Sequence, residues 1–252
     1  MNGAEYPQSR VLAVRCPAWH QPDAPGARAF ERVVSAVREF CPRIEILRPG
    51  ICAFGTRGPA RYFGGEAELA RKVAEAVARL GYDCGVGVAD GMFAALLASR
   101  DSLSDPSGSA GAAEIAPVMI VPPGGTPAFL APRSVTVLGA PELADLLVRL
   151  GIRTLGEFAA LPAAQAGNRF GAQGLLAHRL SRGLDPRPLA ARRPPADLSV
   201  QTEFDPPAEQ SERVVFAAKA LAGQMHARLA ASGLACVRIQ VQVVGEIGRA
   251  HV

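Results

Sequence analysis

The residues that could do chemistry in this sequence are mostly arginines, and they gather in one part of the chain. Residues 151–252 carry 12 basic and eight acidic side chains, whereas residues 1–150 carry 15 of each, so the formal charge of +4 comes from the second part. Between Gly151 and Pro195, seven arginines stand against only Glu157 and Asp185. A local excess of this kind suits contacts with phosphate groups. The alternative is an ordinary solvated surface in a protein from a GC-rich genome, which also accounts for two lysines against 25 arginines.

The thiols give a weaker signal. The five cysteines are scattered, odd in number and without a Cys-x-x-Cys pair, which favours reduced thiols in the cytoplasm over disulfides or a structural zinc site. Cys16 and His20 could be imagined as two metal ligands, but the pattern is weak, and a core position for Cys16 is the simpler interpretation. The chain has neither an apolar run of about 18 residues nor a signal peptide, so we expect no membrane span and no secretion.

The first 130 residues alternate strands with helices, which predicts an α+β domain around a small sheet. The turn Arg48-Pro49-Gly50 predicts a hairpin, because Pro fixes φ and Gly accepts a positive φ. The elements expected from apolar spacing are strands at 11–14, 43–47, 51–54, 84–89 and 115–121 and helices at 27–40, 66–80 and 92–100. Residues 101–111 are rich in Ser, Gly and Asp and predict a loop.

The rest of the chain predicts a helical region, a linker and a second small domain. Short helices with tight glycine turns fill residues 131–183, and Thr154 with Glu157 predicts a capping box at the start of one of them. Residues 184–197, rich in Pro and Arg, predict an extended basic linker. The elements expected after the linker are a strand at 198–204, a helix at 210–232 and a strand at 236–244.

The order of several short motifs resembles the Y-family DNA polymerases. The motifs are Leu47-Arg48-Pro49-Gly50, Gly58-Pro59-Ala60-Arg61-Tyr62-Phe63-Gly64, Val86–Met92, Gly151–Gly156 and Arg182–Pro186. These motifs look most like those of ImuB, the catalytically silent subgroup that acts in a bacterial mutagenesis complex. The resemblance implies a palm at 10–130, a helix-hairpin-helix-like thumb at 131–183 and the first, β-α-β half of a little finger at 198–245.

The chain departs from that family in three places. Only about 25 residues separate the first strand from the hairpin, and a turn and one helix account for them, so the fingers subdomain is missing. The Gly-x-Gly turn that precedes the family's thumb helices reads Leu138-Gly139-Ala140-Pro141, so we expect no phosphate binding by bare backbone amides there. Residues 246–252 match the translated opening of a common sequencing adapter, so we expect them to be an artefactual tail on a longer native protein.

Catalysis in this family implies carboxylates that hold two divalent ions ~3.5–4 Å apart. The first strand would end in an Asp-x-Asp-like pair, and the hairpin turn would carry Ser-x-Asp-Glu. The matching positions here, Arg15-Cys16-Pro17 and Pro49–Cys52, contain no acid. The nearby acids are Glu45 and Asp90, for which an exposed or capping role is the simpler interpretation. We therefore predict no catalytic residue, no metal ligand and no cofactor.

The resemblance implies a non-catalytic homologue that acts in DNA repair, translesion synthesis and damage-induced (SOS) mutagenesis. It would bind DNA and scaffold an error-prone C-family replicative polymerase, the sliding clamp and an ImuA-type accessory protein. The predicted DNA contacts are Arg169, Arg179, Arg182, Arg187, Arg192 and Arg193. Two alternatives stay open: an active translesion polymerase with a displaced Mg²⁺ site, and a truncated gene product without activity of its own.

Overall fold

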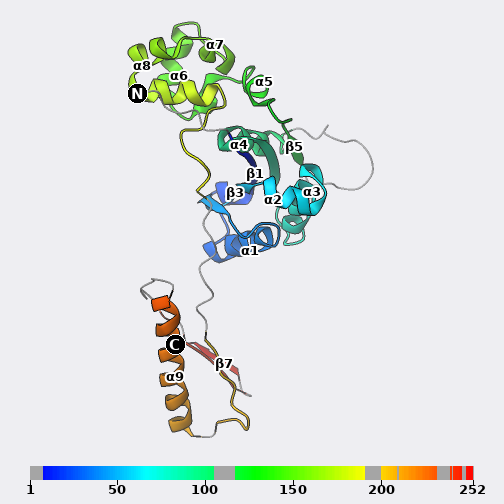
Figure 1. The fold of residues 1–252 in the computed structure, drawn as a ribbon, viewed down its shortest axis with the longest axis vertical. Helices are drawn as coiled ribbons and strands as arrows, with labels where there is room; N and C mark the ends of the chain where they lie inside the picture. Colours follow the sequence, from blue (N-terminus) through cyan, green and yellow to red (C-terminus); the bar gives the residue numbers. More distant parts are fainter. Residues whose placement is uncertain are drawn as a thin grey trace. The chain divides into compact units, whose positions relative to one another are not determined.

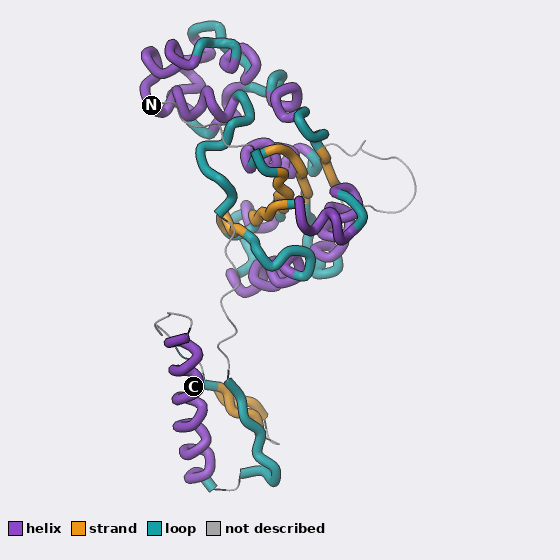
Figure 2. The backbone as a smooth tube through the Cα atoms, viewed as in Figure 1, coloured by secondary structure: helices purple, strands orange, loops and turns teal. Residues whose placement is uncertain are grey.

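The computed structural model combines helices and strands in an α+β fold (Figures 1 and 2). The residues that it describes are 8–104, 117–190, 200–208, 210–231, 239, 241–245 and 248–251. The chain divides into two compact units, Met1–Arg193 and Pro194–Val252, so the division falls inside the predicted linker. None of the described helices combines the length and the apolarity that crossing a membrane requires.

A five-stranded sheet organises the first unit, with strand order β2-β3-β1-β4-β5. Its strands are β1 (Arg10–Arg15), β2 (Glu45–Arg48), β3 (Ile51–Gly55), β4 (Gly85–Asp90) and β5 (Val118–Ile120). All neighbours are antiparallel except β4 and β5, which are parallel. The predicted hairpin is confirmed, because β2 and β3 flank Pro49 and Gly50 and pair with each other.

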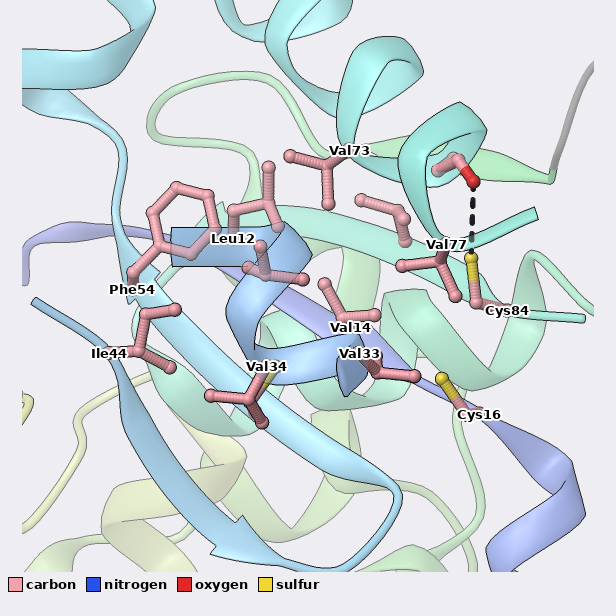
Figure 3. Packing of buried hydrophobic residues seen from close by; sticks show 14 of the residues in the cluster. Leu12, Val14, Cys16, Val33, Val34, Ile44, Phe54, Val73, Val77 and Cys84 are labelled. Carbon is pink, nitrogen blue, oxygen red and sulfur yellow. Dashed lines mark hydrogen bonds between the residues drawn. The ribbon is translucent and has the colours of Figure 1, made fainter. Parts of the chain in front are cut away.

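Helices α1 (Ala27–Arg38) and α3 (Glu66–Ala78) cover one face of this sheet. Apolar side chains at helical spacing form the core between them, as Figure 3 shows for Val33 and Val34 of α1 and Val73 and Val77 of α3 around Leu12 of β1. Both helices confirm their predicted positions. A short helix, α2 (Arg57–Phe63), precedes α3 and was not predicted, because it buries no side chain and so leaves no apolar pattern.

The other face of the sheet lies against α4 (Met92–Asp101), which approaches the strands very closely. A Cβ atom at Gly87 would lie 2.2 Å from the Ser99 nitrogen and 2.3 Å from the Ala95 carbonyl oxygen. α4 can therefore pack this close to the sheet only because β4 carries glycine at position 87. Three alanines, Ala94, Ala95 and Ala98, bring α4 down onto the strands.

The helical region that follows shares its core with the α4 side of the sheet. Its elements are α5 (Thr126–Leu130), the 3₁₀ helix η2 (Val135–Leu138), α6 (Pro141–Arg149), α7 (Leu155–Ala159) and α8 (Ala163–Ser181). The predicted capping box of Thr154 and Glu157 is confirmed, with both of its hydrogen bonds formed. Helix α8 is interrupted at Gly171, whose φ of 65° is not helical.

The second unit is smaller and departs from the prediction in one element. Helix α9 (Ser211–Ala231) is confirmed, and β6 (Gln242–Gly245) overlaps the last predicted strand. The strand predicted at 198–204 is wrong over its described part, because residues 200–204 are not assigned to any strand. A strand needs a partner, and β6 pairs instead with β7 (Gly248–His251). β7 itself lies in the segment that resembles a translated sequencing adapter. The division into palm, thumb and little finger stays a prediction.

Candidate functional site

The end of β1 is where the resemblance places the metal-binding carboxylates, and three elements meet there. Arg15 is the last residue of β1 and pairs with Ile51 of β3 and Gly85 of β4. The Cys16 amide donates a 2.8 Å hydrogen bond to the Gly50 carbonyl oxygen, which ties β1 to the hairpin turn. The 3₁₀ helix η1 (Pro17–His20) then packs on that turn. Gly50 has a φ of 84°, and a Cβ there would lie 2.6 Å from the Cβ of Trp19, so the turn requires glycine.

The donor set at this end does not fit magnesium. Mg²⁺ prefers carboxylate and other oxygen ligands, and the side chains at the matching positions are arginine, cysteine, proline and isoleucine. Cys16 is fully buried, and burial raises the pKa of its thiol to about 12, so it is a core residue. His20 is exposed, whereas Cys16 lies in the core. Within the described part of the chain, no group of three or more His, Cys, Asp or Glu side chains could hold a metal ion.

Glu45 and Asp90 lie on opposite faces of the sheet. Glu45 pairs with Ala53, which pairs with Ala13 of β1, whereas Asp90 pairs with Arg10. Paired residues share a face, and residues three apart on one strand point to opposite faces. These two carboxylates therefore cannot form one dinuclear metal site.

Each of the two acids already has basic or amide partners. Glu45 is buried and accepts hydrogen bonds from the Arg187 guanidinium and from the Ala190 amide, the latter at 2.6 Å. The Arg187 side chain is the main cause that holds the pKa of Glu45 below its ordinary value. Asp90 accepts from Arg10 at 3.4 Å and from the Gly124 amide at 2.7 Å. Both acids therefore join distant parts of the fold, and the exposed or capping role expected for Glu45 is wrong, because its carboxylate is buried against Arg187.

A second polar cluster, which sequence reasoning missed, lies at the opposite end of β1. Arg10 joins the carboxylates of Glu66 and Asp90 and donates a 2.9 Å hydrogen bond to the Val121 carbonyl oxygen. Thr56 donates to Glu66 at 2.7 Å. The hydrogen bond from Arg10 is the main cause that lowers the pKa of Glu66. This cluster links β1, α3 and β4, and both of its carboxylates have hydrogen-bond partners within the fold.

The predicted DNA-contacting arginines occupy different environments. Arg169 is exposed on α8 before the interruption at Gly171, and Arg182 is exposed just after that helix ends. Arg179 is half-buried, and its Nε has no hydrogen-bond partner in the described structure. Arg187 is exposed but paired with Glu45. The last two predicted contacts, Arg192 and Arg193, lie outside the described residues.

The start of the predicted linker is attached to the sheet domain. Besides the pairing of Arg187 with Glu45, the Asp185 carboxylate accepts hydrogen bonds from the amides of Met92 and Phe93 at the start of α4. Burial is the main influence on the pKa of Asp185 and raises it, although these amides act in the opposite direction. The partners are more than 90 residues apart in sequence, which is why no local pattern indicated them.

Comparison with known proteins identifies a family that shares this architecture. DNA polymerase IV of Halobacterium salinarum is 34% identical over 181 residues, which cover 71% of this chain and 41% of that protein. A DinB-family error-prone DNA polymerase from Sulfolobus solfataricus has the same fold, with a TM-score of 0.54 at 16% identity over 71% of this chain and 68% of that chain. The chain belongs to the Y-family DNA polymerase superfamily.

Another Y-family relative matches more of the chain at lower identity. Protein ImuB of Caulobacter vibrioides is 28% identical over 225 residues, which cover 88% of this chain and 46% of that protein. The chain thus spans less than half the length of these two curated relatives. No family model matches the chain.

Proposed function

We propose that this chain is a non-catalytic Y-family homologue that acts in DNA damage tolerance by binding DNA. The observation that carries the proposal is the end of β1 and the hairpin turn, where one arginine and residues without a carboxylate stand in place of the family's metal-binding acids. The opposite orientation of Glu45 and Asp90 counts against a displaced metal pair. The proposal includes no catalytic residue and no resident metal or cofactor.

The proposed DNA-binding surface is the basic stretch from α8 through the linker. Arg169 and Arg182 are exposed on the helical region, and Arg187 begins the basic linker. Phosphate contacts of this kind position a protein on DNA without reading its bases, so the proposed binding is sequence-independent. The resemblance to ImuB supports the further proposal of a scaffold for an error-prone C-family polymerase, the sliding clamp and an ImuA-type protein.

The salt dependence of binding to a fluorescent DNA duplex tests this surface. If three arginines engage together, the logarithm of the affinity should fall with the logarithm of salt at a slope of about −3, because each contact releases condensed counterion. Replacing Arg187, Arg192 and Arg193 together with Ala should flatten this slope and weaken binding to all sequences alike. Replacing Arg169, Arg179 and Arg182 tests the helical part of the surface in the same way.

A matched control removes the same charge elsewhere in the first unit. Arg57, Arg61 and Arg79 are exposed and lie outside the proposed surface, so their replacement with Ala should leave the slope near that of the parent. If both triple variants of the basic stretch bind DNA like the parent and with the same slope, that stretch is an ordinary solvated surface and the proposed interface is wrong.

A further inference from the structure

A β-bulge in the hairpin turns one arginine onto the α4 face of the sheet. Ile46 pairs with Cys52, but the next pair joins Arg48 to Ile51, so Leu47 is the extra residue. In a regular ladder Leu47 would face the same side as Ile51; the bulge gives that position to Arg48 instead. Bulges of this kind are typical places where a sheet re-aims a side chain toward a site.

Arg48 thereby joins a row that already contains Arg15. Ile51 pairs with Arg48 on one side and with Arg15 on the other, and Arg15 pairs with Gly85 beyond it. Paired side chains share a face, and neighbouring strands are about 4.8 Å apart, so the Cα atoms of the two arginines are separated by roughly 10 Å. The two guanidinium groups project from the same face at the end of the sheet.

The end of α4 brings a third arginine to this place. Gly85 lacks a side chain, and a Cβ there would lie 2.0 Å from the Ser99 carbonyl oxygen, so the last turn of α4 rests on the strand beside Arg15. Arg100 is the next residue of that turn, and half of its side chain is exposed. Arg48 is also exposed, whereas Arg15 is half-buried, so the group has one half-buried and two exposed members.

The positive charges of this group are only partly balanced in the described structure, by Asp101 beside Arg100. The Nε of Arg15 is buried without a hydrogen-bond partner. Glu45 of β2 lies on the same face as Arg15, but its carboxylate already accepts hydrogen bonds from Arg187 and from the Ala190 amide. Arg100 reaches Asp101 only at 3.5 Å, and the other oxygen of that carboxylate is paired with Arg133.

The pKa shifts of Arg15 and His20 agree with the positions that the strand register gives these arginines. Burial first, and then the charges of Arg48 and Arg100, lower the pKa of Arg15. Burial first, and then Arg48 and Arg15, lower the pKa of His20. No acid contributes to either shift, and Arg48 and Arg100 act on Arg15 as like charges.

We propose that Arg15, Arg48 and Arg100 form an anion site that binds a phosphate group, at the end of the sheet where Y-family polymerases hold metal ions. Guanidinium groups present planar, paired N–H donors that match phosphate oxygens, and the half-buried Arg15 has an Nε donor that lacks a partner in the described structure. The phosphate group belongs either to the backbone of DNA or to a free nucleotide. The site is separate from the basic stretch of α8 and the linker, and it does not depend on that surface binding DNA.

The test compares the full chain with the double variant Arg48→Gln/Arg100→Gln. Both side chains are exposed, so the variant should fold like the parent. Three probes are titrated at constant ionic strength: inorganic tripolyphosphate, dATP and a fluorescent single-stranded oligonucleotide. The double variant should bind at least one of them about ten-fold more weakly or worse, because it loses two charge-assisted contacts. A loss confined to tripolyphosphate and dATP identifies a free nucleotide as the source, and a loss that includes the oligonucleotide identifies the DNA backbone.

Arg57→Gln provides the control, because Arg57 is exposed and follows the far end of β3. It should bind all three probes as the parent does. The proposal is overturned if the double variant matches the parent for every probe, or if Arg57→Gln loses as much affinity as the double variant. Since Arg48 lies in β2 and Arg100 in α4, this result is independent of the variants in α8 and the linker.

Discussion

Replacing Arg15 with Met should make the protein more stable. The buried Nε donor lacks an acceptor, and an unsatisfied buried donor costs about 1–3 kcal/mol. Arg48 lies roughly 10 Å away by strand spacing, and two like charges at that distance in a water-like medium add about 0.4 kcal/mol. Met keeps most of the length of the side chain and removes both penalties. We expect a gain of about 2 kcal/mol, within the range known for replacing buried charges by apolar residues.

Thermal unfolding with and without tripolyphosphate measures both consequences of this change. A gain of about 2 kcal/mol should raise the Tm of the first unit by roughly 4–8 °C. Tripolyphosphate should raise the Tm of the parent further, because a ligand that binds only the folded state stabilises it, and this increment should shrink in Arg15→Met. Arg57→Met, at an exposed position, should change the stability by no more than about 0.5 kcal/mol. A lower Tm for Arg15→Met than for the parent would refute the reasoning, because the guanidinium would then be making net favourable contacts.

Two further predictions concern the fold of the sheet domain. Gly87→Ala should destabilise the protein by about 3 kcal/mol in urea unfolding, because its Cβ would meet the backbone of α4. Gly26→Ala is the control and should cost far less, because no atom lies within 4 Å of the added Cβ. Equal effects of the two substitutions would contradict the close approach of α4. Glu66→Gln should flatten the acid limb of the stability curve. The hydrogen bond from Arg10 lowers the pKa of Glu66 below its ordinary value, so the stabilisation by its carboxylate is present above that ordinary pKa and is lost as the pH falls through the lowered pKa. Urea unfolding between pH 6 and pH 3 measures this, and an equal flattening in the exposed-site control Glu31→Gln would show that Glu66 has no special part.

The sheet domain could be predicted from the sequence because its signals are local. Phe30, Val33, Val34 and Val37 recur at helical spacing, and all four are buried in α1. The Pro49-Gly50 turn fixed the hairpin in the same way, and Thr154 with Glu157 marked the start of α7 through their own hydrogen bonds. Each of these patterns lies within a few residues, so interactions between neighbours in sequence are enough to fix the local structure.

What could not be predicted depends on contacts between distant residues. Asp185 binds the start of α4, and Arg187 binds Glu45 of β2, across 92 or more residues. The bulge at Leu47 is visible only once β3 is in place, so the row of Arg48 and Arg15 had no signature in the sequence. The strand at 198–204 was predicted from an apolar pattern alone, and residues 200–204 are not assigned to any strand because a partner strand is not supplied to them in the described structure.

The central claim is that this chain is a Y-family homologue that does not catalyse DNA synthesis. Primer extension tests this claim most directly. The full chain is incubated with a primed template, all four deoxynucleotides and either Mg²⁺ or Mn²⁺, beside a mock preparation and an active DNA polymerase IV. We predict no extension above the mock preparation, because the end of β1 and the hairpin turn offer no carboxylate pair to hold the ions. Template-dependent incorporation above the mock level, lost when Glu45 or Asp90 is replaced by the corresponding amide, would contradict the claim and reveal a displaced metal site.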